Sequence, residues 1–446
     1  MKSAAIAAVL AASVAAAPEK RASITPVTVK GNAFFAGDKR FYIRGGSSDA
    51  KDPIADAAGC QRDIAEFQKL GINTVRVYTV DNSANHDTCM NALAAAGIYL
   101  ALDVNTPLYS LNRGNPAPSY NAEYLQSVFA TVDMFSKYDN TLLFFSGNEV
   151  INDDATTNCA PYVKAVTRDI KSYINARKLR SVPVGYSAAD VESNRYEMAA
   201  YMNCGPNATR SDFYAFNDYS YCDPSSFTIS GWDQKVQKFS NYSLPIFLSE
   251  FGCNTNTREF TEVASLYSPN MTGQYSGGLV YEYSQEDSHY GLVTINGGSV
   301  TELPDFTALK NAYAKTPIPS GTGGYKPNGE PSICPSKSST WNVTIADDQL
   351  PAFPSKAQTY LQNGAGTGPG LKGAGSQNAG SGSTSLAPAA SGAVTSGGAV
   401  PSSTGSSGPK PKTGAAASLR PASGVAPFVC GAIVVMSSMI GGAFVL

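Results

Sequence analysis

Between residue 24 and about residue 316, short apolar runs alternate with stretches of helical periodicity, and this alternation constrains the fold more than any other feature. Eight runs have the length and composition of strands: 41–46, 73–80, 99–105, 142–150, 182–188, 213–221, 245–253 and 277–284. Helix-like stretches lie between them at 60–70, 85–97, 120–138, 158–178 and 257–268. Eight such alternations predict an α/β fold, a (β/α)8 TIM barrel. A doubly wound open sheet is the alternative, but no G-x-G-x-x-G follows an early strand.

The composition changes after Pro317. Residues 317–361 are rich in Pro and Gly, and residues 363–424 are nearly all Gly, Ser, Ala, Pro and Thr. Such a segment cannot bury enough apolar surface to fold. We therefore expect a catalytic barrel with a C-terminal extension over 24–340, followed by a disordered, O-glycosylated linker or stalk over 341–424.

Both ends of the chain carry targeting signals. Residues 1–17 have a basic start, a short apolar run and a small-residue end, which is typical of a secretory signal peptide. Residues 425–446 are apolar and uncharged and follow a polar spacer, as in a GPI-attachment signal that is removed. We expect attachment at Gly414, Ala415 or Ala416, and a protein held at the outer leaflet of the plasma membrane and in the cell wall. A tail-anchored transmembrane helix is the alternative.

Cysteines, sequons and charge fit an extracellular protein. Eight cysteines suit an oxidising compartment, and loss of Cys430 with the tail leaves seven, so at least one thiol is unpaired unless chains are cross-linked. The net charge of −2, without a basic stripe, argues against nucleic acid as a partner. Four N-x-S/T sequons predict N-glycosylation, at Asn207, Asn241, Asn270 and Asn342.

The chemistry is expected to rest on two glutamates. Only two histidines exist, which leaves little material for a histidine metal site or a Ser-His-Asp triad, and we expect no metal and no cofactor. Glu149 ends the apolar run "LLFFSGNEV" and Glu250 ends "PIFLSEFGC". In a barrel, reactive residues stand at the C-terminal ends of strands, and strands four and seven lie across from one another. The alternative for Glu149 is an ordinary ion pair with a basic neighbour.

Two facing carboxylates are what glycoside cleavage requires, one as acid and the other as nucleophile or base. Asn148 could bind the sugar 2-hydroxyl, and Tyr219 could donate to Glu250 and keep it ionised. Sugar rings stack on aromatic side chains, although about half of these tyrosines are expected to pack in the core instead. The tyrosines near strand ends are Tyr78, Tyr109, Tyr219, Tyr221, Tyr281 and Tyr283.

Four motifs carry a specific resemblance. The stretches "RGGSSDAKDPIADAAGCQRDIAEFQKLGINTVRVYTVD", "FFSGNEV", "FLSEFGCN" and "SGGLVYEYS" resemble fungal β-1,3-glucanosyltransferases of glycoside hydrolase family 72 over about residues 24–340. The resemblance implies a retaining enzyme that cuts an internal β-1,3-glucan linkage and passes the new end to an acceptor chain. An endo-β-1,3-glucanase and a non-catalytic glucan-binding wall protein are the alternatives.

The resemblance also implies residue roles. Glu149 would be the acid/base and Glu250 the nucleophile. Other positions would bind the donor or acceptor glucan: Tyr78, Asn148, Asp190, Arg195 and Tyr281, with Asn105, Asn112 and Arg113 in the loop after strand three. Apart from the resemblance, we hypothesise that an aromatic side chain on the leaving-group side of the cleft, Tyr281 or Tyr283, holds the acceptor. The implied disulfides are Cys60–Cys89, Cys204–Cys334 and Cys222–Cys253, which leave Cys159 free. Some family members carry a cysteine-rich glucan-binding module that this chain lacks, so binding would rest on the barrel of a monomer.

Overall fold

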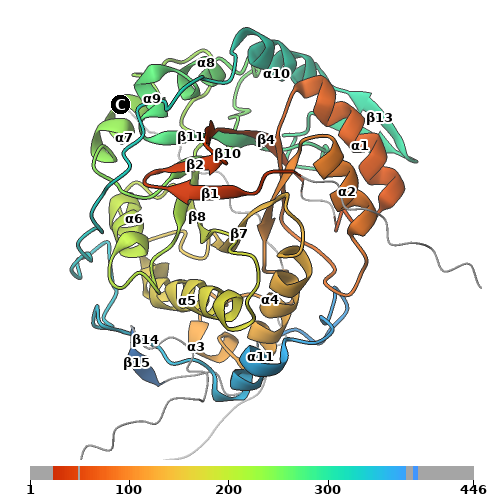
Figure 1. Ribbon diagram of the computed structural model, residues 1–446. Helices are drawn as coiled ribbons and strands as arrows, with labels where there is room; N and C mark the ends of the chain where they lie inside the picture. The colour runs from red at the N-terminus through yellow and green to blue at the C-terminus, as the bar shows by residue number, and fades with distance from the viewer. Residues whose placement is uncertain (1–23, 49–50, 378–384, 390–446) are drawn as a thin grey trace, which may run out of the picture. The chain divides into compact units, whose positions relative to one another are not determined.

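The computed structural model describes residues 24–48, 51–377 and 385–389. Within these ranges, eight parallel strands close into a barrel, and every neighbouring pair is parallel, which confirms the predicted barrel over the open sheet (Figure 1). In chain order they are β4 (Ile43–Ser48), β5 (Thr74–Val77), β6 (Tyr99–Asp103), β7 (Thr141–Asn148), β8 (Val184–Ala189), β9 (Phe213–Asn217), β10 (Ile246–Phe251) and β11 (Tyr275–Val280).

Helices surround the barrel (Figure 1). They are α1 (Ala57–Leu70), α2 (Asp87–Ala95), α3 (Pro116–Ser119), α4 (Ala122–Phe135), α5 (Ala160–Ala176), α6 (Arg195–Asn203), α7 (Trp232–Lys238), α8 (Glu262–Leu266), α9 (Pro269–Thr272), α10 (Pro304–Lys315) and α11 (Gln358–Asn363), with short 3-10 turns at Ala155–Cys159 and Ser355–Ala357. The five expected helices correspond to α1, α2, α4, α5 and α8. The sequence patterns did not predict α6, α7 or α10.

Local sequence explains where the long helices begin and end. Asp56 caps α1 by accepting a hydrogen bond from the amide of Ala58, and Gly71 ends that helix in the left-handed region at φ 71°. Asn121 caps α4 in the same way, accepting from the amide of Tyr124 at 2.8 Å. Polar caps followed by apolar periodicity therefore fix these two helices.

A small antiparallel sheet closes the N-terminal end of the barrel. It consists of β1 (Val27–Lys30), β2 (Ala33–Ala36) and β3 (Lys39–Phe41), and Figure 1 shows β1 and β2 across the barrel opening. Phe34 packs against Phe213 and Phe247, with ring centroids 6.1 Å and 5.9 Å away, and Phe145 joins the same buried cluster. The interior at this end is thus a packed core. The remaining strands form two pairs, β12 (Val293–Asn296) with β13 (Ser299–Glu302), and β14 (Gln349–Pro351) with β15 (Leu386–Pro388).

The expected domain boundary at residue 340 is too early. Trp341 is buried and lies 5.5 Å from Tyr201, ring to ring, and Leu361 on α11 is buried as well. Phe353 packs near Phe129 of α4. Residues 341–377, expected to belong to the stalk, are therefore part of the folded domain.

Hydrogen bonds and close packing explain why a glycine-rich segment folds here. The amide of Asn121 donates to the carbonyl of Ser376 at 2.7 Å, and Asn82 accepts from the amide of Gly370 at 2.9 Å. A Cβ at Gly368 would come within 2.1 Å of the Asn82 side chain, and one at Gly373 within 1.9 Å of a tyrosine hydroxyl. The glycines allow this close approach because they have no Cβ. From composition alone, the same glycines would indicate a flexible segment.

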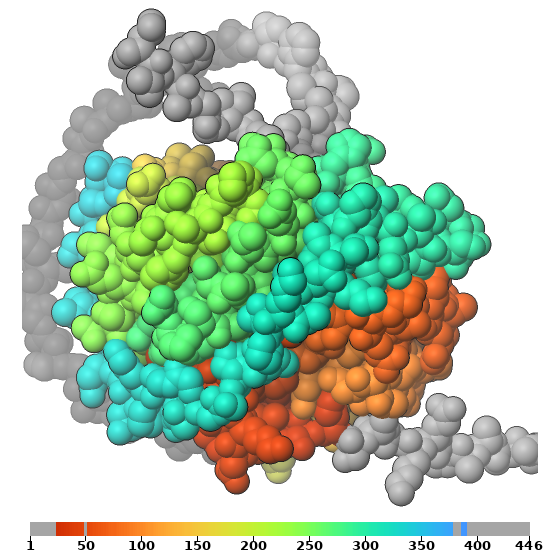
Figure 2. Space-filling view, turned by 90° about the horizontal axis from the view of Figure 1, so that it is seen from above, coloured from red at the N-terminus to blue at the C-terminus, as the bar shows by residue number. Residues whose placement is uncertain are grey.

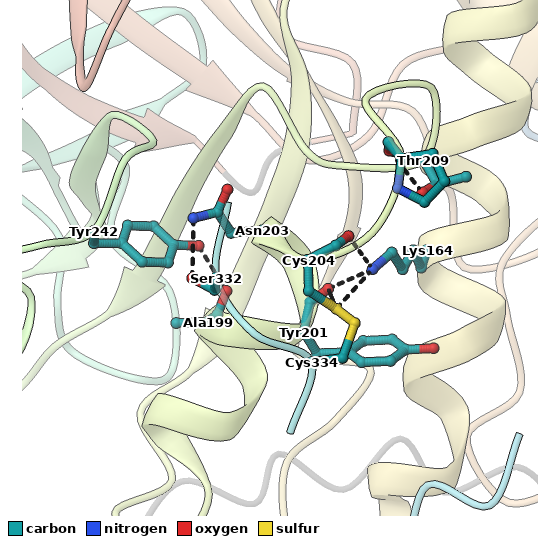
Figure 3. Close-up of a disulfide and its surroundings, with 10 residues drawn as sticks. Lys164, Ala199, Tyr201, Asn203, Cys204, Thr209, Tyr242, Ser332 and Cys334 are labelled. Atoms are coloured by element: carbon teal, nitrogen blue, oxygen red, sulfur yellow. Dashed lines mark hydrogen bonds between the residues drawn. A yellow bond between two sulfur atoms is a disulfide. The ribbon is translucent and has the colours of Figure 1, made fainter. Parts of the chain in front are cut away.

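Three disulfides brace the fold, and they are the pairs that the resemblance implies. They join Cys60 to Cys89, Cys204 to Cys334 and Cys222 to Cys253, while Cys159 is a buried free cysteine. Figure 3 shows Cys204–Cys334 beside α5, tying the segment after α10 to the end of α6.

The targeting predictions lie outside the described residues. These are the signal peptide at 1–17, the tail at 425–446, its attachment residues and, of the proposed stalk, residues 378–384 and 390–424. Among the helices that the structure describes, none has the length and apolarity needed to cross a membrane.

Candidate active site

Glu250 lies near the carboxyl end of β10 and is surrounded by donors. It is 7% exposed, and its Oε1 accepts from the hydroxyl of Tyr78 at 2.8 Å. Its Oε2 accepts from the hydroxyl of Tyr219 at 2.7 Å, as the sequence predicted. Each of these bonds favours the ionised carboxylate.

Arg76 supplies a buried positive charge beneath Glu250. Its Nη1 lies 3.3 Å from Glu250 Oε1, and its Nε and Nη2 bind both oxygens of Asp103 at 2.9 Å and 3.2 Å. Burial alone would lower the pKa of Arg76, but Asp103, Tyr78 and Glu250 together raise it above its ordinary value. A permanently charged guanidinium thus stands under the carboxylate.

Burial dominates the protonation of Glu250. It raises the pKa of Glu250 to about 7, and the charge of Glu149 acts in the same direction. Arg76 and the two tyrosine hydroxyls act against this shift and lower the pKa. The ionised form therefore depends on these three donors.

Glu149 follows β7 in an unusual backbone conformation. Its φ is 48°, in the left-handed region that residues other than glycine rarely adopt. Its amide donates to the carbonyl of Ser187 at 2.9 Å, and its carbonyl accepts from Arg113 at 2.8 Å. Such strain is held by surrounding contacts and concentrates at functional sites.

Asn217 connects the two glutamates. Its Nδ2 donates to Glu149 Oε1 at 2.8 Å, and its Oδ1 accepts from Ser249, the residue before Glu250, at 2.9 Å. Asn217 is also the register partner of Glu250 between β9 and β10. The same network reaches Asn148, whose Oδ1 accepts from Ser187 at 2.7 Å. The structure therefore gathers Glu149, Glu250 and Asn148 at one face of the barrel.

Aromatic rings surround this face. Tyr281 lies edge-on to Tyr78 and Tyr219, with centroids 6.4 Å and 6.5 Å away. Tyr290, which the sequence analysis did not single out, lies 5.4 Å from Tyr281 and 5.5 Å from Tyr219. Half-buried aromatic rings can stack on the apolar faces of sugar rings, and the polar groups around them can bind the sugar hydroxyls.

Asp190 and Arg195 form an ion pair, but not an ordinary surface one. Asp190 Oδ2 also contacts Lys235 Nζ at 2.8 Å, and Lys235 contacts Asp218 at 2.6 Å. Asp218 directly precedes Tyr219, so this charge network fixes the segment that carries a donor to Glu250.

Of the three loop residues expected after β6, one contacts Glu149 directly and the other two do not. Arg113 binds the Glu149 carbonyl, and the thiol of Cys159 donates to the carbonyl of Arg113 at 3.0 Å. Asn105 donates to Ser146 in β7 at 3.1 Å. Asn112 accepts from the amide of Gly114 and shapes the turn, without a direct bond to either glutamate.

Three of the tyrosines at strand ends lie in the core, as expected for about half of them. Tyr283 is 3% exposed, packs on Phe67 and donates to Asp63 at 2.9 Å, so its hypothesised contact with the acceptor is wrong. Tyr109 and Tyr221 are buried as well.

Sequence reasoning missed Arg76, Asp103, Asn217 and Lys235. Arg76 could have been found, because it interrupts an apolar strand in "NTVRVYTV", and a buried charge needs a partner. The sequence next to Asn217 and Lys235 contains no pattern that would indicate a role in the site.

The described part of the chain offers no metal site beside the glutamates. Over 24–48, 51–377 and 385–389 there is no cluster of three His, Cys, Asp or Glu side chains that could hold an ion. His86 is buried against Asp52, with Nε2 to Oδ2 at 2.9 Å.

Comparisons with known proteins agree with this geometry. Residues 16–317 match the glycoside hydrolase family 72 model, described as glucanosyltransferase. The chain is 63% identical over 384 residues to the Aspergillus fumigatus 1,3-beta-glucanosyltransferase gel1, covering 84% of this chain and 85% of that one. It is 53% identical over 372 residues to the Saccharomyces cerevisiae 1,3-beta-glucanosyltransferase GAS5, covering 80% and 76%.

A solved structure is also similar. Saccharomyces cerevisiae Gas2p, as a mutant in complex with laminaritetraose and laminaripentaose, superposes with a TM-score of 0.70 and 37% identity, covering 75% of this chain and 76% of that one. The family model alone spans more than half of the sequence. The chain therefore belongs to the glucanosyltransferases of glycoside hydrolase family 72.

Proposed function

We propose that this protein is a retaining 1,3-β-glucanosyltransferase that elongates cell-wall glucan. It cleaves an internal β-1,3 linkage and transfers the new reducing end to the non-reducing end of a second β-1,3-glucan. The observation that carries the proposal is the pair of glutamates at the carboxyl ends of β7 and β10, with Asn217 bonded to the Glu149 carboxylate and paired in strand register with Glu250.

In this mechanism Glu250 attacks the anomeric carbon of the donor while Glu149 protonates the departing glycosidic oxygen. The bond between sugar and leaving chain breaks, and an ester between the sugar and Glu250 forms. Arg76, Tyr78 and Tyr219 keep Glu250 ionised before the attack. Asn217 orients Glu149 through its 2.8 Å bond.

The second step returns both glutamates to their starting states. Glu149, now a carboxylate, takes the proton of the acceptor hydroxyl, and that oxygen displaces Glu250 from the anomeric carbon. Water, at about 55 M, competes for the same ester, and only a positioned acceptor can win, because orientation supplies effective molarities of about 10⁵ M or more. Tyr281 is the candidate for holding the acceptor, and Asp190, Arg195, Asn105, Asn112 and Arg113 for holding the donor.

Product analysis tests this function. A single β-1,3-gluco-oligosaccharide, reduced at its end as a label, should give products both shorter and longer than itself. Each lengthened product should be matched by a released labelled fragment whose length is that of the substrate minus the length transferred. Only shorter products at millimolar substrate would favour the endo-β-1,3-glucanase instead, and no reaction would favour a glucan-binding wall protein.

The location of the enzyme is a second part of the proposal. Removal of 1–17, and replacement of the chain beyond Gly414, Ala415 or Ala416 (the spacer and the tail 425–446) by a GPI lipid, would place a monomeric barrel at the cell surface, carrying N-glycans at exposed sequons. Three disulfides support an extracellular location. Phosphatidylinositol-specific phospholipase C should release the protein from intact cells, and retention after treatment would contradict the anchor.

A further inference from the structure

A groove of about 620 Å³ lies on the outside of the barrel, away from the two glutamates. One wall is formed by α6 and the end of α7, and the other by residues 326–333, a segment named here the strap. Figure 2 shows the strap, in cyan, lying against this green part of the surface. Its volume is typical of a site for a small ligand.

The groove is topologically separate from the active site. Asn241 and Ser243 line it and precede β10, whose opposite end carries Glu250. A strand of this length separates its two ends by roughly 15–20 Å. A ligand in the groove would therefore not be the donor or acceptor at Glu250.

The lining suits a carbohydrate. Tyr196 is half-buried, lies 5.3 Å from Phe239 ring to ring, and has Lys238 Nζ 5.9 Å from its ring centre. Glu330 and Lys326 lie on the opposite wall. Aromatic faces and charged hydrogen-bonding groups together match the apolar faces and hydroxyls of pyranose rings.

The sequence around the groove indicates which carbohydrate would occupy it. Asn241 begins the sequon Asn241-Tyr242-Ser243, is exposed and lines the groove itself. A sugar attached to its amide is already held beside the groove, so its docking is intramolecular and avoids the cost of bringing two molecules together. We propose that the groove holds the first sugars of an N-glycan on Asn241 and that this glycan packs against the strap.

The contacts of Ser243 also indicate when, relative to folding of the strap, Asn241 is glycosylated. Its hydroxyl accepts from Asn203 at 2.9 Å, and Asn203 also donates to Ser332 in the strap at 3.0 Å (Figure 3 shows Asn203 and Ser332). Gly329 covers Ser243 so closely that a Cβ there would come within 2.5 Å of the serine Cβ. The sequon hydroxyl is thus occupied in the folded protein. Glycosylation of Asn241 must precede closure of the strap and formation of Cys204–Cys334.

Site-resolved deglycosylation tests the docked glycan. The protein, secreted from a eukaryotic host, is digested by a peptide N-glycosidase in its native state and after reduction and unfolding, and each sequon is followed by mass spectrometry. Release at Asn241 should be at least about tenfold slower than at the other occupied sequons in the native protein, equivalent to ~1.4 kcal/mol of protection. After unfolding the rates should be equal. An unmodified Asn241, or equal native rates, overturns the proposal.

Hydrogen exchange tests the contact with the strap. Asn241→Gln should accelerate exchange in 326–333, whereas the control Asn270→Gln, at an exposed sequon on α9, should not. Unchanged exchange in Asn241→Gln overturns the contact. Protection of the strap in that variant by a free β-1,3-gluco-oligosaccharide would instead make the groove a site for the wall polymer. Neither readout depends on activity, so both are independent of the proposed function.

Discussion

Asn217 donates a hydrogen bond of 2.8 Å to Glu149 and is at the same time the strand partner of Glu250. One amide on β9 therefore fixes the acid/base relative to the nucleophile, although the glutamates come from strands β7 and β10. The chemistry consequently depends on side chains between the glutamates as much as on the glutamates themselves.

Glu149→Gln and Glu250→Gln should each abolish transfer and hydrolysis while leaving the fold intact. Glutamine keeps the size of glutamate but can neither transfer a proton nor form the ester, so turnover should fall by about 10²–10⁴-fold or more. Product formation and thermal unfolding check this. Glu123→Gln, at an exposed position on α4, is the matched control. Near-normal turnover in either variant would refute the role of that residue.

Tyr219→Phe should shift the acid limb of the pH profile to higher pH. Burial already raises the pKa of Glu250 to about 7, and loss of a donor to the carboxylate raises it further. Because the attacking form is ionised, activity falls as pH drops through this pKa, so the fall should begin at higher pH. The profile of kcat/KM measures it. Tyr283→Phe, whose hydroxyl binds Asp63 instead, should leave the limb in place.

Arg76→Met should destabilise the protein by about 3–5 kcal/mol, because it leaves Asp103 buried without its cation. The double variant Arg76→Met/Asp103→Leu should regain most of that stability but little activity, since Glu250 still lacks its positive neighbour. Denaturant unfolding and turnover, measured on both variants, separate the two effects. Activity that returns together with stability would limit Arg76 to a structural role.

Tyr281→Ala should shift the products from transfer toward hydrolysis. Tyr281 packs between Tyr78, Tyr219 and Tyr290 at the active-site face, where an acceptor sugar must be held against water. The ratio of lengthened to shortened oligosaccharides measures the change, with Tyr360→Ala on α11 as a control far from this cluster. An unchanged ratio would place the acceptor elsewhere.

Lys164→Met should flatten the dependence of stability on pH above neutrality. Lys164 is buried and donates to the carbonyls of Tyr201 and Cys204 (Figure 3), and burial lowers its pKa to about 7. Between that pH and about 10.4, the unfolded chain carries a proton that the folded protein lacks. Stability should therefore rise with pH through this window, by up to about 1.4 kcal/mol per pH unit, and fall as pH drops toward 7.

Unfolding at several pH values measures this slope. Lys171→Met, on the same helix and at a position paired with Asp212, is the matched control. Parallel slopes for Lys164→Met and the unmodified protein would show that Lys164 does not titrate in this range.

The barrel and its two glutamates could be predicted because their signals are local. An apolar run that ends in a carboxylate, as at Glu149 and Glu250, predicts both a buried strand and the end of that strand at which the reactive residue lies. The partners of these residues are not local. Asn217 lies in a strand between them, and Lys235 acts through Asp218, so only the folded chain shows their roles.

The error at residue 340 has a different cause. A prediction from composition depends on how many apolar side chains a segment has. Residues 341–377 are instead held by a few buried side chains such as Trp341 and by hydrogen bonds from their backbone to Asn82 and Asn121. Glycine is read as flexibility, although at Gly368 and Gly373 it is the residue that lets two segments touch.

The small sheet that closes the N-terminal end has a consequence for how a polymer is handled. With Phe34, Phe145, Phe213 and Phe247 filling the interior, no chain can be threaded through the barrel. A glucan strand must instead lie across the open face, where Glu149 and Glu250 stand. An enzyme built in this way needs no free terminus on the donor, so it can cut a strand whose two ends are already fixed in the wall network.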